Sequence, residues 1–102
     1  MNPAKLTAQK AAINRFKNDA LVFEQGQRWR RAAIRWEHCA KLANKKEDQG
    51  FFLHSAFFCY RRANDLPKAD AMIKQCRNKY ILIGDKMAVA LCATELEAIN
   101  AG

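Results

Sequence analysis

The sequence is poor in residues that break helices. It has four glycines and two prolines among 102 residues, and it lacks dense runs of β-branched residues. This scarcity excludes a fold made of many short strands and tight turns. Half of the residues are apolar, enough for the core of one domain of this length. The composition therefore predicts an all-α protein with a single helical domain over residues 1–102.

The chain also lacks paired cysteines and long apolar runs. Its four cysteines, at positions 39, 59, 76 and 92, form no C-x-x-C pair. The first residues contain no apolar signal-peptide core, and no stretch approaches the roughly 20 apolar residues of a membrane span. Because disulfide frameworks belong to secreted chains, we expect reduced thiols, a cytoplasmic location and no membrane partner.

Groups suited to catalysis are few. The chain has two histidines, His38 and His54, and no H-E-x-x-H, G-x-S-x-G or G-x-x-x-x-G-K-[ST] sequence. Cys59 lies five residues after His54, which places the two side chains on different faces of a helix. We therefore expect no catalytic residue and no cofactor, in a protein that is not an enzyme.

An internal repeat organises the chain at an offset of 37 residues, at which seven positions share apolar character. The pairs are Phe16 with Leu53, Ala20 with Phe57, Phe23 with Tyr60, Trp29 with Leu66, Ala32 with Ala69, Trp36 with Ile73 and Cys39 with Cys76. Such a repeat predicts two tandem helix-turn-helix hairpins, about residues 8–43 and 51–80. A C-terminal capping helix, about 86–99, brings the total to about five helices and is expected to cover the open end of the stack.

Apolar spacing and turn residues set the expected boundaries. Helices are expected over about 8–25, 28–43, 51–63, 66–80 and 86–99. Gly26 is expected to end the first helix, since glycine tolerates the left-handed conformation after a helix, and the polar segment 44–50 is expected to be a loop. Asp65 is expected to cap the fourth helix, with Pro67 in its first turn.

The cysteines also permit a zinc-site hypothesis. His38, Cys39, Cys59 and Cys76 are of the residue types that bind zinc, but structural sites normally bring their ligands in close pairs. Cys39 and Cys76 instead occupy equivalent small-residue positions of the repeat, where a free cysteine packs as a small apolar side chain. The pattern favours buried core thiols and no metal.

The second expected helix has the clearest amphipathic pattern. An arc of about 120° holds Trp29, Ala32, Ala33, Trp36, Cys39, Ala40 and Ala43. Both tryptophans are therefore expected in the core. The third expected helix, with Phe51, Phe57 and Phe58, is apolar around most of its circumference, which predicts cover on more than one side.

The opposite side of the second helix holds the candidate binding residues. Ile34 projects between Arg31 and Arg35 on one flank and Arg30 and Lys41 on the other. An aliphatic side chain with a charged rim is typical of a protein contact, although single exposed aliphatics are common. Two arginines that end the third helix are expected to join this surface or to complement the helix dipole. The candidate partner-binding residues are Arg30, Arg31, Ile34, Arg35, Lys41, Arg61 and Arg62.

The net charge of +8 is unevenly spread. Residues 25–80 hold 13 Lys and Arg against 5 Asp and Glu, whereas residues 81–102 hold 1 against 3. This asymmetry suggests an acidic partner, either nucleic acid or an acidic protein surface. The alternative is a basic surface that only aids solubility.

Two family resemblances follow from these motifs. The spacing of Trp29, Ala32, Trp36 and Cys39 resembles the second helix of a tetratricopeptide repeat. Residues 12–63, with the run 20–36, the segment 40–43 and Phe57-Phe58-Cys59, look like the ANR family of small regulators from bacteria and phages, and more loosely like PerC-type activators. The ANR resemblance implies repression of virulence activators of the AraC type and contact with the histone-like nucleoid-structuring protein.

Three functions remain open from the sequence. The first is a transcription regulator that binds an activator or nucleoid protein and alters its oligomerisation. The second is direct DNA binding by the second helix, with Arg28, Arg31 and Arg35 near phosphates or bases. The third is a helical adaptor or secretion chaperone. A homodimer through residues 81–83 and the fifth helix is also possible in each case.

Overall fold

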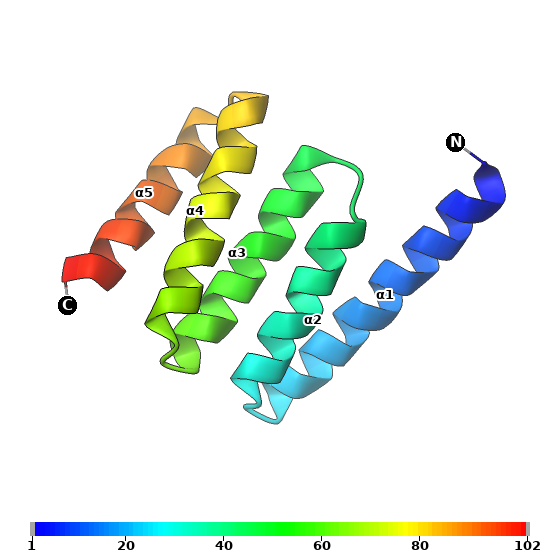
Figure 1. The fold of residues 1–102 in the computed structure, drawn as a ribbon, viewed down its shortest axis with the longest axis horizontal. Coiled ribbons are helices and arrows are strands. Elements are labelled where there is room, and N and C mark those ends of the chain that lie inside the picture. Colours follow the sequence, from blue (N-terminus) through cyan, green and yellow to red (C-terminus); the bar gives the residue numbers. More distant parts are fainter. Residues whose placement is uncertain (1, 102) are drawn as a thin grey trace.

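The computed structural model describes residues 2–101, and within this range the chain forms five helices. They are α1 (Pro3–Gln25), α2 (Trp29–Leu42), α3 (Lys46–Arg62), α4 (Leu66–Ile83) and α5 (Lys86–Ala101). The helices lie side by side in chain order and alternate in direction (Figure 1). The array measures 46 × 35 × 17 Å, so it is flat, with two broad faces and two ends formed by α1 and α5. The expected all-α fold with about five helices is confirmed. None of the described helices combines the length and apolar character that a membrane span requires.

The 37-residue offset reappears in the hairpin turns. Gln27 and Asn64, which are 37 residues apart, both adopt positive φ, at 58° and 59°. In each turn the backbone N–H of the residue that follows donates to the carbonyl five residues before it. Arg28 donates to Phe23 over 2.8 Å, and Asp65 donates to Tyr60 over 2.9 Å. These bonds close the helix end in the same way in both hairpins. Gly26 ends α1 as expected, but its φ is −85°, because the left-handed position falls one residue later, on Gln27.

Helix α1 begins five residues earlier than expected. The Asn2 side chain accepts a hydrogen bond from the backbone N–H of Ala4 over 2.9 Å, and Pro3 is the first helical residue. An Asn cap followed by Pro is a favourable helix start, since proline lacks the N–H that would have no partner there.

Helix α3 also begins early, so the expected loop at 44–50 was wrong. Residues 46–50 are helical, and Glu47 and Asp48 place negative charge in the first turn, where it complements the helix dipole. Gly50 does not break the helix: a Cβ atom there would lie 3.0 Å from the ring of Tyr80. Gly50 therefore lets α3 and α4 approach closely.

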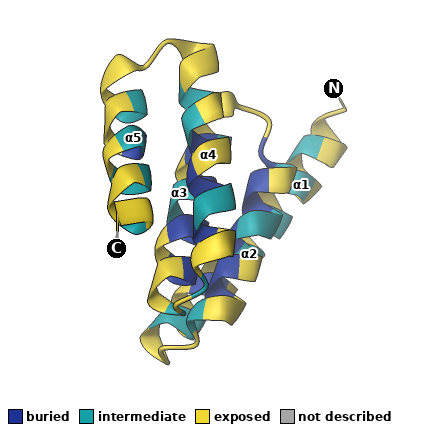
Figure 2. Ribbon diagram, turned by 60° about the vertical axis from the view of Figure 1, so that its left-hand side comes forward, coloured by how far each residue is buried: buried dark blue, intermediate teal, exposed yellow. Residues whose placement is uncertain are grey.

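The core lies along α2, α3 and α4 (Figure 2). The expected stripe on α2 is buried apart from Trp29, which is half-buried, so the prediction for Trp29 holds only in part. Phe57 and Ile73 are the largest fully buried side chains. Helix α3 is covered on more than one side, by α2 and α4, as predicted, and Phe51 and Phe58 are exposed on its remaining side.

The C-terminal helices use the expected turn residues. The Asp65 side chain accepts a hydrogen bond from the N–H of Lys68 over 3.2 Å and so caps α4, with Pro67 in the first turn. Gly84 ends α4 in the left-handed conformation with φ of 73°. Helix α5 then packs on α4 through one side only, with Cys92 buried.

Candidate functional site

The outer side of α2 carries most of the residues expected to bind a partner. Ile34 is 38 % exposed, as expected, and Arg31 and Lys41 are exposed beside it. The other two arginines already have partners in this chain. Arg30 forms an ion pair with Asp65 over 3.3 Å, and Arg35 Nε lies 3.8 Å from a carboxylate oxygen of α1. The free charge around Ile34 is therefore smaller than the sequence suggests.

The structure does not bring Arg62 onto that surface. Its guanidinium lies 5.0 Å from the ring centre of Trp29, and it lines a hollow floored by Trp36. Ile34 is two residues from Trp36, so it points to the opposite side of α2. Arg61 is exposed beside Arg62 at the end of α3. The expectation that both arginines join the Ile34 surface was wrong for Arg62, because α3 presents it to the other broad face.

A hollow of about 260 Å³ between α1 and α3 is the most distinctive surface feature. Its lining, which we name the α1–α3 groove, consists of Lys17, Leu21, Glu24, Trp29, Trp36, Phe51, Ser55, Phe58, Cys59 and Arg62. Phe51 and Phe58 are seven residues apart, two turns along one side of α3, and they are 54 % and 44 % exposed. Leu21 of α1 is 43 % exposed. Large apolar side chains thus meet solvent from both walls, with Lys17 and Arg62 as cations beside them.

The floor of the groove is fixed by one carboxylate. Glu24 accepts a hydrogen bond from Trp36 Nε1 over 2.6 Å and lies 3.6 Å from Cys59 Sγ. Burial, together with the nearby negative charge of Glu24, raises the pKa of the Cys59 thiol to about 12. The thiol is therefore protonated at neutral pH and donates to the carboxylate. Because Glu24 is engaged twice within the chain, it is positioned to hold the groove rather than to bind a ligand.

A second hollow continues along the same side of α1. It has a volume of about 490 Å³ and is lined by residues of α1, the α2–α3 connection and α3, among them Leu6, Lys10, Ile13, Lys45 and Phe52. The Gln9 side chain spans this region, donating hydrogen bonds to the carbonyl of Leu42 and, over 2.9 Å, to Asn44 Oδ1. Together the two hollows run along α1 on one broad face of the molecule.

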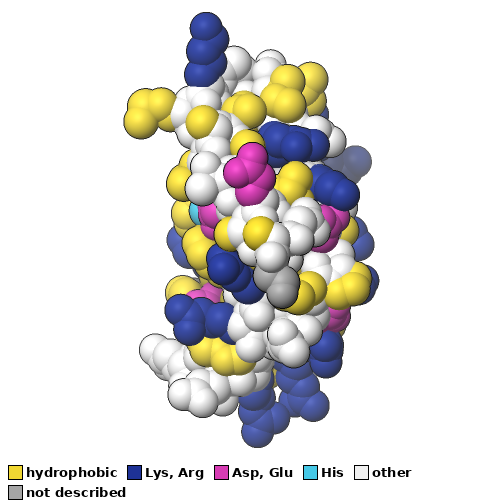
Figure 3. Space-filling view, turned by 90° about the vertical axis from the view of Figure 1, so that its left-hand side faces the viewer, with side chains coloured by type: hydrophobic (Ala, Val, Ile, Leu, Met, Phe, Trp, Pro, Cys, Tyr) yellow, Lys and Arg dark blue, Asp and Glu magenta, His cyan; other side chains and the backbone are white. Residues whose placement is uncertain are grey.

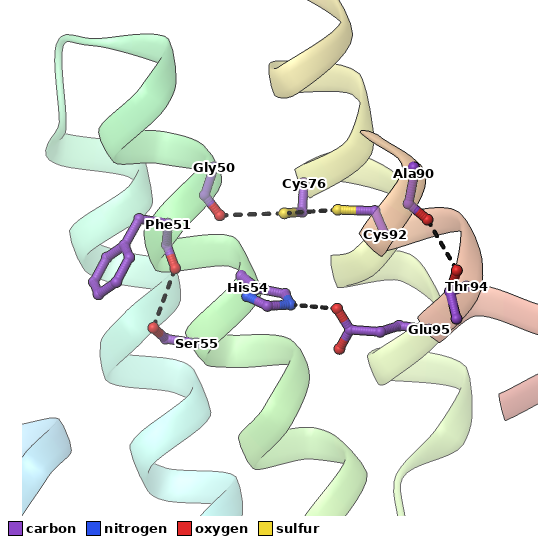
Figure 4. A network of polar contacts seen from close by, with 9 residues as sticks. All are labelled: Gly50, Phe51, His54, Ser55, Cys76, Ala90, Cys92, Thr94 and Glu95. Atoms are coloured by element: carbon purple, nitrogen blue, oxygen red, sulfur yellow. Dashed lines mark hydrogen bonds and ion pairs between the residues drawn. The ribbon is translucent and has the colours of Figure 1, made fainter. Parts of the chain in front are cut away.

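The other three cysteines form contacts within the core. Cys76 Sγ lies 3.3 Å from the carbonyl of Gly50 and 3.5 Å from Cys92 Sγ (Figure 4). Burial raises the pKa of Cys76 and Cys92, and it raises that of Cys39 to about 11. Thiols with raised pKa are poor nucleophiles and poor metal ligands at neutral pH. All four cysteines are free and buried, as the core-packing interpretation expects.

His54 has a different partner from the cysteines. Its Nε2 lies 2.7 Å from Glu95 Oε1, a contact that ties α3 to α5 (Figure 4). No cluster of three or more His, Cys, Asp or Glu side chains suited to a metal ion occurs among residues 2–101.

Sequence reasoning missed the α1–α3 groove. The signal was present in the spacing of Phe51, Phe58 and Arg62 along one side of α3, but the apolar breadth of that helix was interpreted only as cover on more than one side. Comparisons with models of protein families, with curated proteins and with solved structures find no match to this chain. The geometry of its surfaces is therefore the main ground for assigning a function.

Proposed function

We propose that this protein is a small regulator that acts by binding another protein in the α1–α3 groove. The observation that carries the proposal is the exposure of Phe51 and Phe58 opposite Leu21 on the facing wall. Contiguous apolar side chains with a charged rim are typical of protein-binding surfaces, and aromatic residues supply much of the affinity there.

The charges beside the groove favour an acidic partner segment. Lys17 and Arg62 line the hollow itself, and Lys10 and Lys45 line its continuation. A segment that buries apolar side chains against the phenylalanines and aligns carboxylates with these cations fits this arrangement.

The ANR resemblance supports a regulator as the identity of the protein. It covers residues 12–63, which span most of α1 together with α2 and α3, and these helices build the groove. On this ground we propose that the partner is an activator of the AraC type or the histone-like nucleoid-structuring protein, whose oligomerisation changes on binding. Residues 64–102 lie outside the resemblance.

Two matched substitutions test the groove against the outer side of α2. Phe58 and Ile34 have similar exposure, at 44 % and 38 %. Because the Phe58 ring also packs against His54 and Phe57, circular dichroism is used to check that both serine variants are folded. Calorimetric titration with a purified AraC-type activator and with the nucleoid-structuring protein should show that Phe58→Ser weakens binding at least tenfold, about 1.4 kcal/mol, and that Ile34→Ser leaves it unchanged. The reverse result would move the site to α2. Absence of binding to either protein would refute the proposed partners.

The tryptophans provide an independent reporter. Trp29 and Trp36 both line the groove, so a partner without tryptophan that enters it should change their emission by displacing water. Binding with unchanged emission would place the partner elsewhere.

A second candidate function is duplex DNA binding through the outer side of α2. It is favoured by the exposed cations Arg31 and Lys41 and by the net charge of +8. Phosphate contacts weaken steeply with salt, and loss of one cation lowers the salt slope by about 1. A duplex titration at two salt concentrations, repeated with Arg31→Ala, tests this function. No saturable binding at low salt would remove it.

A further inference from the structure

The outer side of α5 is apolar and unpartnered. Met87 and Leu91 are 85 % and 55 % exposed, among the most exposed large apolar side chains in the part of the chain described. At helical spacing they share this side with small residues, and we name the set the α5 stripe: Met87, Ala90, Leu91, Thr94 and Ala98. The stripe contains no charged residue. Hydrophobic side chains reach the surface at this end of the molecule in patches that lie between charged side chains (Figure 3).

The opposite end of the stack is finished mainly with polar residues. The outer side of α1 exposes Thr7, Asn14, Asn18 and Gln25, with Val22 as the one large apolar side chain among them. A terminal helix with a polar outer side is the ordinary way in which a stacked helical array meets water. Helix α1 meets this requirement and α5 does not, so α5 resembles an inner helix whose neighbour is missing.

The charge distribution favours one kind of partner for the outer side of α5. Residues 2–62 hold 13 Lys and Arg against 5 Asp and Glu, whereas residues 63–101 hold 5 against 5. An acidic partner is therefore drawn to α1–α3 and not to α5. Two copies of the chain, each with a net charge of +8, repel each other least when they meet through the neutral half.

We propose that the α5 stripe binds the α5 stripe of a second copy of this chain about a two-fold axis. The two-fold axis passes near Thr94, in the middle of α5, so the two α5 helices run antiparallel. The same stripe of each copy then forms both sides of the contact. Alanine and threonine at the crossing permit the close approach, 8–10 Å between axes, that packed helices adopt. A head-to-tail contact with α1 is disfavoured, because it would bury the amides of Asn14 and Asn18 without partners.

The area involved sets the strength of the dimer. A 16-residue helix is about 24 Å long and presents a side about 10 Å wide, or about 240 Å² of footprint. Stable complexes bury about 800 Å² on each partner. The dimer is therefore weak, with a dissociation constant in the micromolar range or above.

Sedimentation equilibrium of the full chain, from micromolar to millimolar concentration, tests the association. The average mass should rise toward that of a dimer and stop there. Leu91→Glu places charge in the stripe and should weaken association at least tenfold, whereas Val22→Glu, at an exposed apolar position on the outer side of α1, should leave it unchanged. A monomer at every concentration, or a dimer that tolerates Leu91→Glu, would overturn the proposal.

A cross-link tests the two-fold arrangement. The four native thiols are buried, so Thr94→Cys supplies the reactive thiol at the surface. A short bis-maleimide should join two Thr94→Cys chains efficiently and two Val22→Cys chains poorly, with circular dichroism confirming that both variants are folded. A mixture of the two variants that cross-links mainly from position 22 to position 94 would reveal head-to-tail association and refute the two-fold dimer.

Discussion

Helices α1 and α5 form the two ends of the same stack, and they differ in how they meet solvent. Each has one fully buried residue, Ala20 in α1 and Cys92 in α5. Helix α1 shows a mainly polar outer side, interrupted by Val22, and another side of it helps to form an aromatic groove beside cations. Helix α5 has an uncharged apolar outer side in the neutral half of the chain. The difference underlies the two proposed contacts, an acidic protein partner in the groove and a second copy of the chain on the α5 stripe.

The largest expected effect separates the inner helices from α5. Phe57→Ala removes a fully buried ring and should lower the free energy of unfolding by about 3–5 kcal/mol. Leu91→Ala, on the exposed stripe, should change it by less than about 0.5 kcal/mol in the monomer. Urea unfolding at low protein concentration measures both. If Phe57→Ala does not fold, Ile73→Val should still cost about 0.5–1.5 kcal/mol. Equal effects of core and stripe substitutions would mean that the stripe is packed within the monomer.

Alkaline pH should destabilise the core that holds the thiols. Burial raises the pKa of Cys39 from 9.0 to about 11 and that of Cys59 from 9.0 to about 12. A raised folded-state pKa gives stability that is complete below pH 9 and is lost as the pH rises toward the folded value. Above pH 9 the free energy of unfolding should fall by up to about 1.4 kcal/mol per pH unit for each such thiol. Thermal unfolding between pH 8 and 11 measures the loss, and Cys39→Ala should reduce the slope. A flat profile would contradict buried, protonated thiols.

The attachment of α5 depends on its contact with His54. Glu95→Ala leaves His54 Nε2 without its partner at 2.7 Å and should cost about 1–2 kcal/mol. Amide hydrogen exchange should accelerate in α5 before it does in α3. Glu97→Ala, an exposed residue of the same helix, is the matched control and should have no effect. Uniform acceleration in all helices would show that α5 does not open separately.

Salt gives the smallest expected effect. It should change the affinity of the two surfaces in opposite directions. Raising ionic strength screens attraction between the cationic groove and an acidic partner, so that binding should weaken several-fold. The same change screens repulsion between two copies of charge +8, so self-association should strengthen slightly. Parallel titrations at low and physiological salt test both signs. A loss of self-association with salt would indicate that ion pairs, not the stripe, hold the dimer.

Local chemistry made part of this structure predictable. The amphipathic stripe of α2, the cap at Asp65 and the offset between hairpins follow from spacing and turn residues. The early start of α3 did not, because the polar residues 46–49 resemble a loop until α4 packs beside them and places Tyr80 against Gly50.

The groove was less accessible to sequence reasoning. Its floor depends on contacts distant in sequence, such as that between Glu24 and Trp36. Its walls are open because α1 and α3 flank α2 on one face, so Phe51 and Phe58 have no helix above them. The apolar breadth of α3 correctly predicted neighbours on more than one side, but composition does not report which side of the helix lacks a neighbour.

The central claim is that the two ends of the stack differ as contact surfaces, and amide chemical shifts over a concentration series test it most directly. On concentration, the shifts of Met87, Leu91, Thr94 and Ala98 should move together along a two-state dimer isotherm, while those of Asn14 and Asn18 stay constant. Shifts that move in α1 instead, or that are independent of concentration throughout, would contradict the claim.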